Sequence, residues 1–234
     1  MESKLDAYIL CGGEGTRLKP VTGNTPKPLV KINDKVLLDL IIDNLSAQKI
    51  INRIVLLAKY KHEDFKKHYH NKLFNNKKVE ILVQKDLLGT GGAVIESLQN
   101  HSTKKVIVLN GDTIIKLNFD RILNNSILNK ENIVFCSHVR DIREFGFVKV
   151  NRENQLITFD EKRLSKKAKS GLAYAGVAIF DSSFLEKLKF NKKVISLEKD
   201  IISRNKDTFY VEKIEDVFLD VGTPERFIVA KNSI

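Results

Sequence analysis

Residues 9–20 read ILCGGEGTRLKP, and residues 25–29 read TPKPL shortly afterwards. The apolar run that leads into the first stretch, residues 5–10, is suited to a buried parallel strand. It ends in three glycines within four positions, where the backbone can approach an anion closely. Successive backbone N–H groups in such a turn form a concave anion site. We therefore expect a β-strand that opens directly into a phosphate-binding loop.

Basic side chains around these glycines support the same interpretation. Arg17 can donate parallel hydrogen bonds to phosphate oxygens, while Lys19 and Lys27 supply compact positive charges further along the segment. An ordinary strand-to-helix turn would contain the glycines without needing these cations. The pattern therefore favours a site for the triphosphate of a nucleotide.

Two better-known glycine motifs do not match this spacing. A Walker loop needs Gly-x-x-x-x-Gly-Lys before Ser or Thr, and the dinucleotide fingerprint Gly-x-Gly-x-x-Gly opens directly into a helix. Here Gly15 is followed by residues 16–18 and then by Pro20, Pro26 and Pro28, so we expect an irregular loop. The sequence contains neither a Walker lysine nor a kinase motif, which makes a kinase or ATPase the least favoured reading.

Strands and helices alternate in the first half of the chain, which favours βαβ units and a mostly parallel sheet in an α/β fold. The apolar patterns predict strands at residues 5–10, 53–57, 79–83 and 106–109, and helices at residues 35–48, 62–69, 92–98 and 118–128. In the second half they predict strands at residues 133–139, 146–150 and 156–160 and a strand that ends over 177–180, with helices at 182–188 and 223–231.

The composition indicates the size of the folded domain and the compartment in which the protein works. The chain has 234 residues, 42% of them hydrophobic, which is enough for one domain with a substantial core. Its apolar stretches are far shorter than the ~20 residues that span a bilayer, and its first residues lack the order of a secretory signal. Cys11 and Cys136 give neither a disulfide framework nor a zinc-site spacing. We therefore expect a cytoplasmic protein with no membrane partner.

Two aspartates could supply a metal site. Asp112 follows the strand predicted at residues 106–109, so it would lie at a carboxyl strand end, where open α/β sheets bind their ligands. Asp220 follows a second short apolar run and precedes Gly222. Two carboxylates together with substrate phosphates suit Mg²⁺. Each aspartate by itself could equally be a turn or cap residue.

The chain resembles the sugar-1-phosphate nucleotidyltransferases, whose signature is a Gly-Gly-x-Gly-Thr-Arg-Leu loop with a downstream Pro-Lys-Pro. The likeness covers nearly the whole chain, with further matches at Gln84, LGTGGA (88–93), LNGD (109–112), DEK (160–162), AG (175–176) and FLDVGTPE (218–225). It implies a Rossmann-like nucleotidyltransferase fold, with a mostly parallel central sheet flanked by helices and a small β-rich substrate-binding part. It also implies a single domain over residues 1–234, with a nucleotide-binding half of about 1–115 and a sugar-phosphate-binding half of about 116–234.

The resemblance assigns roles residue by residue. Arg17, Lys27 and Asp112 would be catalytic, and Asp112 and Asp220 would hold Mg²⁺. The nucleotide would be bound by Leu10, Cys11, Gly12, Gly13, Gly15, Thr16, Arg17, Gln84, Gly89, Thr90 and Gly111. The sugar phosphate would be bound by Gly146, Glu161, Lys162 and Gly176. A glutamine offers both a donor and an acceptor, so Gln84 fits guanine, uracil, thymine or cytosine.

Within the family, the LGTGGA segment and SLEKD at residues 196–200 look most like D-glycero-α-D-manno-heptose 1-phosphate guanylyltransferase and its close relatives. That likeness implies a Mg²⁺-dependent transfer from GTP to the heptose 1-phosphate, which releases pyrophosphate and makes GDP-heptose for a bacterial capsule or lipopolysaccharide. The sequence departs from the family pattern at two positions, which limits how far the family's residue roles apply to this chain. Arg163 stands where many relatives have proline, and Phe145 stands where several have tyrosine, so one hydroxyl contact to substrate would be absent.

Other functions stay open at this point. The same fold could use UTP, CTP or dTTP with a hexose or amino-sugar 1-phosphate. A catalytically silent subunit that senses a nucleotide-sugar is another alternative, although such a sensor could have lost any of the catalytic side chains. The formal charge of +11 could suggest nucleic acid, but the lysines are spread along the chain without interleaved aromatics. We expect no nucleic acid partner, and pairing of two copies into a homo-oligomer stays open.

Overall fold

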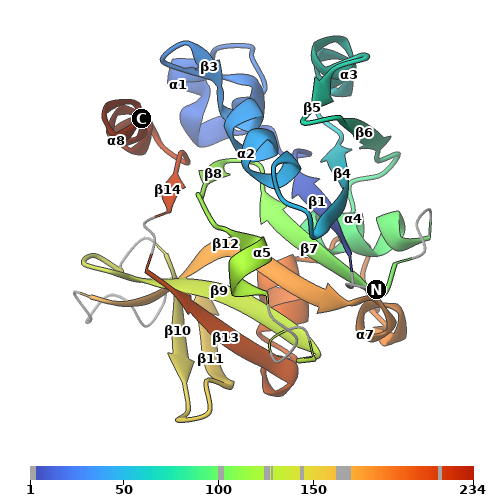
Figure 1. Cartoon of the computed structure of the whole chain (residues 1–234), viewed down its shortest axis with the longest axis vertical. Coiled ribbons are helices and arrows are strands. Elements are labelled where there is room, and N and C mark those ends of the chain that lie inside the picture. The colour runs from blue at the N-terminus through green and yellow to red at the C-terminus, as the bar shows by residue number, and fades with distance from the viewer. Residues whose placement is uncertain are drawn as a thin grey trace.

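The computed structural model describes residues 4–99, 103–123, 127, 129–142, 145–161, 170–215 and 218–234. Its centre is a mixed sheet of ten described strands, ordered β11-β10-β12-β7-β1-β4-β6-β5, with β9 beside β12 and β13 beside β9 (Figure 1). The strands are β1 (Leu5–Leu10), β4 (Ile51–Ala58), β5 (Leu73–Phe74), β6 (Lys77–Val83), β7 (Lys105–Asn110), β9 (Asn132–Val139), β10 (Gly146–Val150), β11 (Leu156–Glu161), β12 (Gly171–Asp181) and β13 (Phe209–Ile214).

Shorter elements surround this sheet. Two small antiparallel pairs join β2 (Lys31–Ile32) with β3 (Lys35–Val36), and β8 (Thr113–Ile114) with β14 (Leu219–Asp220). The α-helices are α1 (Lys19–Thr22), α2 (Leu37–Ser46), α3 (His62–Tyr69), α4 (Gly89–Leu98), α5 (Phe119–Ile122), α7 (Ser182–Lys187) and α8 (Pro224–Ser233). Tighter or wider turns are the 3₁₀-helices η1 (Thr16–Leu18), η2 (Lys27–Leu29) and η5 (Lys206–Thr208) and the π-helix η4 (Leu197–Ile202).

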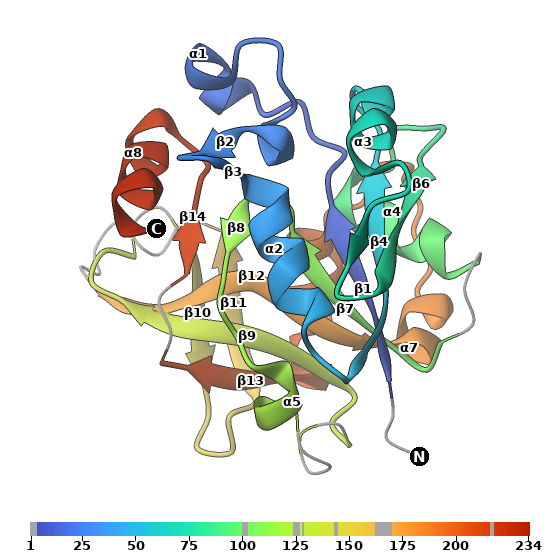
Figure 2. The same ribbon diagram turned by 45° about the horizontal axis from the view of Figure 1, so that its top comes forward.

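The first half of the chain builds the parallel part of the sheet. Strands β7, β1, β4 and β6 are parallel neighbours, as the alternation of strands and helices predicted. Helix α2 packs on one face, with Leu38 and Ile42 in the same core as Ile9 (Figure 2). Helix α4 packs on the other face, with Val94 in the same core as Tyr8. Coverage on both faces explains why β1 is an almost unbroken apolar run.

The long strand β12 joins the two halves of the sheet. One edge of β12 pairs with β9, while its other edge pairs first with β10 and then with β7, all antiparallel. Its pairing with β9 shifts register between Tyr174 and Ala178. Gly176 lies within that irregularity with a φ of +72°, a conformation that costs glycine little. The shift separates the part of β12 beside the parallel strands from the part beside β10.

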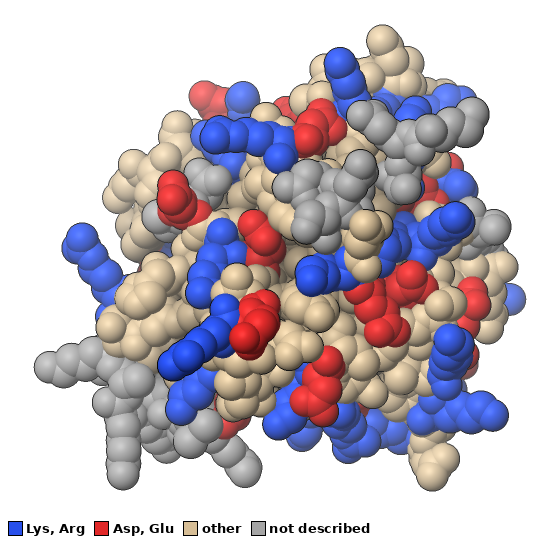
Figure 3. All heavy atoms as spheres, turned by 60° about the horizontal axis from the view of Figure 1, so that its bottom comes forward, with Lys and Arg blue, Asp and Glu red and all other residues tan. Residues whose placement is uncertain are grey.

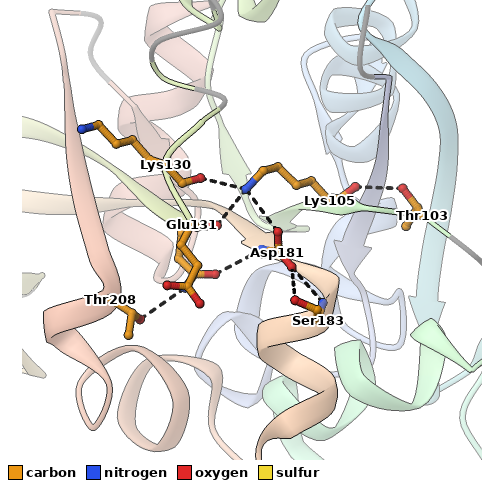
Figure 4. A network of polar contacts seen from close by, with 8 residues as sticks. Thr103, Lys105, Lys130, Glu131, Asp181, Ser183 and Thr208 are labelled. Carbon is orange, nitrogen blue, oxygen red and sulfur yellow. Dashed lines mark hydrogen bonds and ion pairs between the residues drawn. The ribbon is translucent and has the colours of Figure 1, made fainter.

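A polar network links the start of β7 to the start of β9 and the end of β12 (Figure 4). Lys105 Nζ donates to the carbonyl oxygens of Lys130 and Glu131 at 2.8 and 2.9 Å, and it lies 3.7 Å from Asp181 Oδ2. Asp181 caps α7 by accepting from the backbone N–H of Ser183 at 2.9 Å. The Lys105 side chain is 14% exposed, and this burial lowers its pKa. The network therefore has a structural role, far from the carboxyl ends of the parallel strands.

Most elements agree with the sequence predictions, and the differences have local causes. The helix predicted at residues 35–48 is wrong at its start, because residues 35–36 form β3 and α2 begins at Leu37. The loop after the glycines is not irregular throughout, since it contains η1, α1 and η2. Of the helix predicted at residues 118–128, Phe119–Ile122 is α5, while 124–126 and 128 lie outside the described residues. No pattern predicted β13 or η4.

The described surface carries both signs of charge. On the face in Figure 3, lysine and arginine side chains are interspersed with aspartate and glutamate and form no single basic patch among the described residues. Within the described part of the chain, no helix is long and apolar enough to cross a membrane.

Candidate active site

A cleft of about 420 Å³ opens at the carboxyl ends of the parallel strands. Leu10 at the end of β1, Leu57 on β4 and Asn110 at the end of β7 lie on its floor. Parallel strands place their carboxyl ends at one edge of the sheet, and ligands of open α/β sheets bind there. The glycine loop that follows β1 therefore lines the cleft, at the sheet edge where a ligand is expected to bind.

The glycine loop is built against the segment that carries Lys27. Gly15 has a φ of +64°, and a Cβ at this position would lie 2.9 Å from the Cβ of Lys27. Lys27 itself is 8% exposed and begins the short helix η2. Because Gly15 leaves room for the lysine stem, the loop and the second basic segment close over the same cleft. Arg17 lines the cleft from η1.

Two aspartates are brought together by pairing between distant segments. Strand β14 pairs with β8 so that Asp220 is opposite Thr113, and the N–H of Val221 donates to the carbonyl of Asp112 at 2.9 Å. Burial, together with the charge of Asp112, raises the pKa of Asp220 above its usual range. The two carboxylates therefore share one electrostatic environment at the junction of β7 and the C-terminal segment.

Each of these aspartates contacts a basic side chain. Lys27 Nζ lies 2.5 Å from Asp112 Oδ2, and Arg226 Nη1 lies 2.6 Å from Asp220 Oδ2. The second oxygen of Asp220 accepts from the N–H of Gly222 at 2.5 Å. Arg17 adds a third cation to the same region. Basic and acidic side chains thus lie beside one another in this region.

Gln84 lines the same cleft and follows strand β6. Its backbone N–H donates to Ala58 at the end of β4, which continues the β4–β6 pairing by one residue. Its side chain is 9% exposed and lies beside Gly12, where a Cβ would be 3.3 Å from Oε1. The side-chain Nε2 is buried and has no hydrogen-bond partner among the described residues. A buried donor of this kind suits a carbonyl oxygen of a ligand.

The turn that carries Gly89 and Thr90 is locked to a segment near residue 196. The N–H of Ile195 donates to the carbonyl of Leu88 at 2.7 Å, and the N–H of Gly91 donates back to Ile195 at 2.8 Å. Thr90 Oγ1 accepts from the N–H of Leu197 at 2.9 Å. This interlock carries Glu198, in the first turn of η4, into the cleft.

A second cavity of about 360 Å³ adjoins the cleft. Both are lined by Arg17, Asn110, Asp112 and Glu198, which mark their junction. Aromatic side chains form much of the remaining wall, together with Gly146, Gly176, Asp220 and Arg226; the aromatics are Phe145, Phe159, Tyr174 and Phe218. Among its described lining residues, three carry a negative charge and two a positive charge.

The structure places most of the predicted site residues around these two spaces. All predicted nucleotide-binding residues line the first cleft, as do Lys27 and Asp112. Gly146, Gly176 and Asp220 line the second cavity. Glu161 ends β11, opposite Gly146, and Lys162 lies outside the described residues, as does Arg163. Lys19 is exposed in α1 and does not line either space, so its predicted contribution to the phosphate site is not supported.

The residues that line the two spaces without having been predicted as site residues include two basic, one acidic and one amide side chain. Glu198 lies within SLEKD, which the sequence offered only as a family likeness. Asn110 directly follows the apolar part of β7, a position that could have been included with Gly111 and Asp112. Lys59 and Arg226 had no local signal, because single basic residues are common along this chain.

Comparison with known proteins gives a consistent picture. Residues 6–234 match the family model described as nucleotidyl transferase. The chain is 33% identical over 230 residues to D-glycero-alpha-D-manno-heptose 1-phosphate guanylyltransferase of Campylobacter jejuni, covering 95% of this chain and 97% of the relative. It is 31% identical over 235 residues to the bifunctional protein GlmU of Methanococcus aeolicus, which covers 98% of this chain but only 54% of that relative.

Solved structures agree in fold. The crystal structure of HddC from Yersinia pseudotuberculosis has a TM-score of 0.85 and 28% sequence identity, with 98% of this chain and 99% of that chain covered. A complex of the same protein with GMP-PN superposes with the same TM-score. These likenesses confirm the α/β nucleotidyltransferase fold that the sequence predicted.

Proposed function

The chain belongs to the nucleotidyl transferase family and is a sugar-1-phosphate nucleotidyltransferase, and from this premise we propose that it joins GTP to D-glycero-α-D-manno-heptose 1-phosphate. The products would be GDP-heptose and pyrophosphate. The observation that carries the proposal is the pair of adjoining spaces that share Arg17 and Asp112, because the reaction needs two phosphate groups to meet.

Two kinds of relative support the choice of substrates. Guanylyltransferases named for this heptose phosphate match 95% and 98% of the chain at 33% and 27% identity. HddC, whose fold superposes on this chain, has been solved with GMP-PN. The buried donor of Gln84 suits the carbonyl oxygen of a guanine, which adenine lacks. Uracil, thymine and cytosine also carry a carbonyl, so Gln84 alone does not choose among these bases.

The reaction forms one phosphorus–oxygen bond and breaks another. A phosphate oxygen of the sugar 1-phosphate attacks the α-phosphorus of GTP, and the bond between that phosphorus and its β-bridging oxygen breaks to release pyrophosphate. The sugar phosphate has a second pKa of about 6, so it needs no general base at neutral pH. The protein then contributes position and charge.

The residues in the cleft suit these tasks. Arg17 and the backbone N–H groups of the glycine loop would bind the leaving pyrophosphate. Lys27 would stabilise the charge that develops at the α-phosphate. The loop of Gly89 and Thr90 would bind the base together with Gln84. Gly146 and Gly176 would leave room for the sugar ring, while Glu161 would accept hydrogen bonds from its hydroxyl groups.

Asp112 and Asp220 would hold Mg²⁺, which supplies positive charge between the two phosphate-bearing substrates. One observation fits this assignment. Burial and the charge of Asp112 both raise the pKa of Asp220, so a cation held by the two carboxylates would offset their repulsion. A site with two carboxylates is completed by phosphate oxygens, which is the usual manner of Mg²⁺.

The test is pyrophosphate release with Mg²⁺ from GTP, UTP, CTP, dTTP and ATP, each paired with the 1-phosphates of the manno-heptose, mannose, glucose and N-acetylhexosamine. Release confined to GTP and the manno-heptose phosphate is the expected result. Release with another pair would contradict the proposed substrates and favour a uridylyl-, cytidylyl- or thymidylyltransferase. Silence with every pair would contradict the proposed substrates altogether and favour a nucleotide-sugar sensor.

A further inference from the structure

Arg226 is the basic side chain that sets the second cavity apart from the first. Two arginines line the second cavity, but Arg17 lines the first cleft as well. Of the described lysines and arginines, Arg226 alone lines the second cavity without lining the first. It comes from helix α8, which no site prediction included. A ligand anion in the second cavity would therefore have this cation beside it in addition to Arg17.

The side chain is held on two sides. Arg226 Nη1 donates to Asp220 Oδ2 at 2.6 Å, and its guanidinium carbon lies 4.5 Å from the centre of the Phe145 ring. Phe145 is itself fixed by an edge-to-face contact with Phe218, with the ring centres 5.2 Å apart. An ion pair and a stacked ring together orient the guanidinium plane. The arginine is only 17% exposed, so it is part of the cavity wall.

The backbone at the start of α8 places Arg226 at this wall. Thr223 caps the helix and its Oγ1 accepts from the N–H of Arg226 at 3.4 Å. Pro224 occupies the first helical position, where its missing N–H costs nothing. Asp220 lies six residues earlier in the chain, on β14, so the aspartate and the arginine are positioned by the same short segment.

The charges of the cavity indicate which groups a substrate phosphate would meet there. Asp112, Glu198 and Asp220 line the cavity against Arg17 and Arg226, so the described lining carries an excess of negative charge. A sugar 1-phosphate carries nearly two negative charges at neutral pH, since its second pKa is about 6. Mg²⁺ held by Asp112 and Asp220 would offset two of these negative charges, and Arg226 is the protein's own cation, among the described residues, that lines this cavity alone. A guanidinium has five N–H donors in a planar fork that matches phosphate oxygens, and Asp220 Oδ2 accepts from one of them, at Nη1.

We propose that Arg226 binds the phosphate of the sugar 1-phosphate in the second cavity, with Phe145 and Asp220 as positioning residues that orient its guanidinium. The assignment rests on the proposed function. It names a cation from α8 that would bind the acceptor substrate. In this proposal, different arginines bind the phosphates of the two substrates. Arg17 binds at the junction and serves the triphosphate, while Arg226 serves the acceptor.

The experiment is calorimetric titration of D-glycero-α-D-manno-heptose 1-phosphate into the wild-type protein and three variants. Arg226→Gln removes the charge, Arg226→Lys keeps the charge without the fork, and Lys231→Ala removes an exposed charge from the same helix. We expect Arg226→Gln to weaken binding by about tenfold or more, because a hydrogen bond to a charged group is lost. The affinity of Arg226→Lys for the heptose 1-phosphate should lie between those of the wild type and Arg226→Gln. The affinity of Lys231→Ala should equal that of the wild type.

Two companion titrations distinguish direct binding from an effect through Asp220. The affinity for GTP should change by less than about twofold in Arg226→Gln, which is within 0.5 kcal/mol. The affinity for Mn²⁺ in the presence of GTP should not fall, because the substitution removes a positive charge beside the metal ligand Asp220. Unchanged affinity for the heptose phosphate in that variant would overturn the proposal. So would a loss of Mn²⁺ affinity as large as the loss of sugar-phosphate affinity, since Arg226 would then act on the metal ligand Asp220. Thermal melting checks the fold, and Arg226→Lys carries the test if the glutamine variant does not fold.

A failure of the proposed function gives a different result. If the wild-type protein does not bind the heptose phosphate, inorganic phosphate and the other sugar 1-phosphates replace it as probes. Binding of inorganic phosphate that Arg226→Gln weakens by about tenfold would support Arg226 as the phosphate ligand while the sugar assignment fails. Phosphate binding that is insensitive to Arg226→Gln would overturn the proposal.

Discussion

Lys27 Nζ lies 2.5 Å from Asp112 Oδ2, which joins the segment after the glycine loop to the carboxyl end of β7. The lysine side chain is 9% exposed and the aspartate side chain 34% exposed, so the pair is only partly open to water. One member is predicted to stabilise the α-phosphate and the other to hold the metal ion. Their contact makes the two tasks interdependent, and the first two predictions test this.

Asp112→Asn should abolish measurable turnover and leave the fold intact. The substitution keeps the shape of the side chain but removes the charge that a metal ligand needs, and loss of one electrostatic contact at such a site lowers rates by about 10²–10³. Pyrophosphate release and thermal melting measure the two effects. Asp207→Asn, at an exposed position in η5, is the matched control and should retain full activity. Near-normal turnover in Asp112→Asn would contradict the metal assignment.

Lys27→Met should lower the rate and, at the same time, strengthen the binding of Mn²⁺ to the protein without nucleotide. Removal of the ammonium frees Asp112 Oδ2 for a metal ion and removes a repulsive charge. Electron paramagnetic resonance of Mn²⁺ measures its affinity directly. The double variant with Asp112→Asn should lose this gain, because interacting residues are not additive. Equal Mn²⁺ affinity in wild type and Lys27→Met would show that the ion pair does not compete with the metal.

Gln84→Met should reduce the preference for GTP over ATP without destabilising the fold. The side chain keeps its length but loses the buried Nε2, which has no protein partner among the described residues. A charge-neutral hydrogen bond to a base is worth ~1 kcal/mol, so the KM for GTP should rise about fivefold. Steady-state kinetics with both nucleotides, together with urea unfolding, measure the effect. A marked loss of unfolding free energy would instead indicate a structural role for Gln84.

Gly89→Ala should destabilise the protein, whereas Gly13→Ala should not. Gly89 has a φ of +75°, and a Cβ there would lie 2.4 Å from the carbonyl oxygen of Ile195. We expect a cost of ~1–3 kcal/mol from backbone strain alone, and more from the displaced segment near Ile195. Gly13 has no atom within 4 Å of an added Cβ and is the matched control from the other loop of the cleft. Equal unfolding midpoints in urea would show that the interlock with Ile195 is not rigid.

Stability should fall as the pH rises above about 9. Burial raises the pKa of the Cys11 and Cys136 thiols above the ordinary value of 9.0. The folded state therefore keeps both protons in a range where the unfolded state releases them, so the thiols favour folding below pH 9 and lose this contribution as the pH rises. Each thiol contributes a slope of ~1.4 kcal/mol per pH unit in that range. Urea unfolding between pH 8 and 10 measures the slope.

Cys136→Ala provides the internal check for this slope. The variant should lose about half of the thiol contribution, although a small cavity lowers its stability at every pH. In the native protein at pH 8, both thiols should react with a thiol reagent far more slowly than in urea, because burial suppresses the thiolate. Rapid labelling of the native protein would contradict the burial of both side chains.

Local patterns were enough for β1, the glycine loop after it and the position of Asp112. The run of residues 5–10 became β1, and the glycines after it line the first cleft. Such predictions succeed because a buried parallel strand and the loop after it are contiguous in the chain. The same reasoning placed Asp112 at a strand end, where the sheet brings it to the cleft.

Strands β12 and β13 show what neighbouring residues in the chain cannot predict. Phe209–Ile214 alternates weakly and becomes a strand only because β9 offers it a parallel partner. The length of β12 likewise reflects neighbours on both edges, where local apolarity indicated only its end. Strand formation there is decided by pairing across the sheet, which no short window of sequence contains.

The sequence by itself determined the glycine loop after β1, the parallel strands of the first half and the carboxylate after β7, because each depends on residues next to one another in the chain. Only the tertiary structure decided that Asp220 lies beside Asp112, through the pairing of β14 with β8. It also decided that Glu198 and Arg226 reach the cavities, since η4 is locked to the Gly89 turn and α8 begins beside Asp220. These positions depend on contacts between distant segments, whose geometry exists only after the chain has folded.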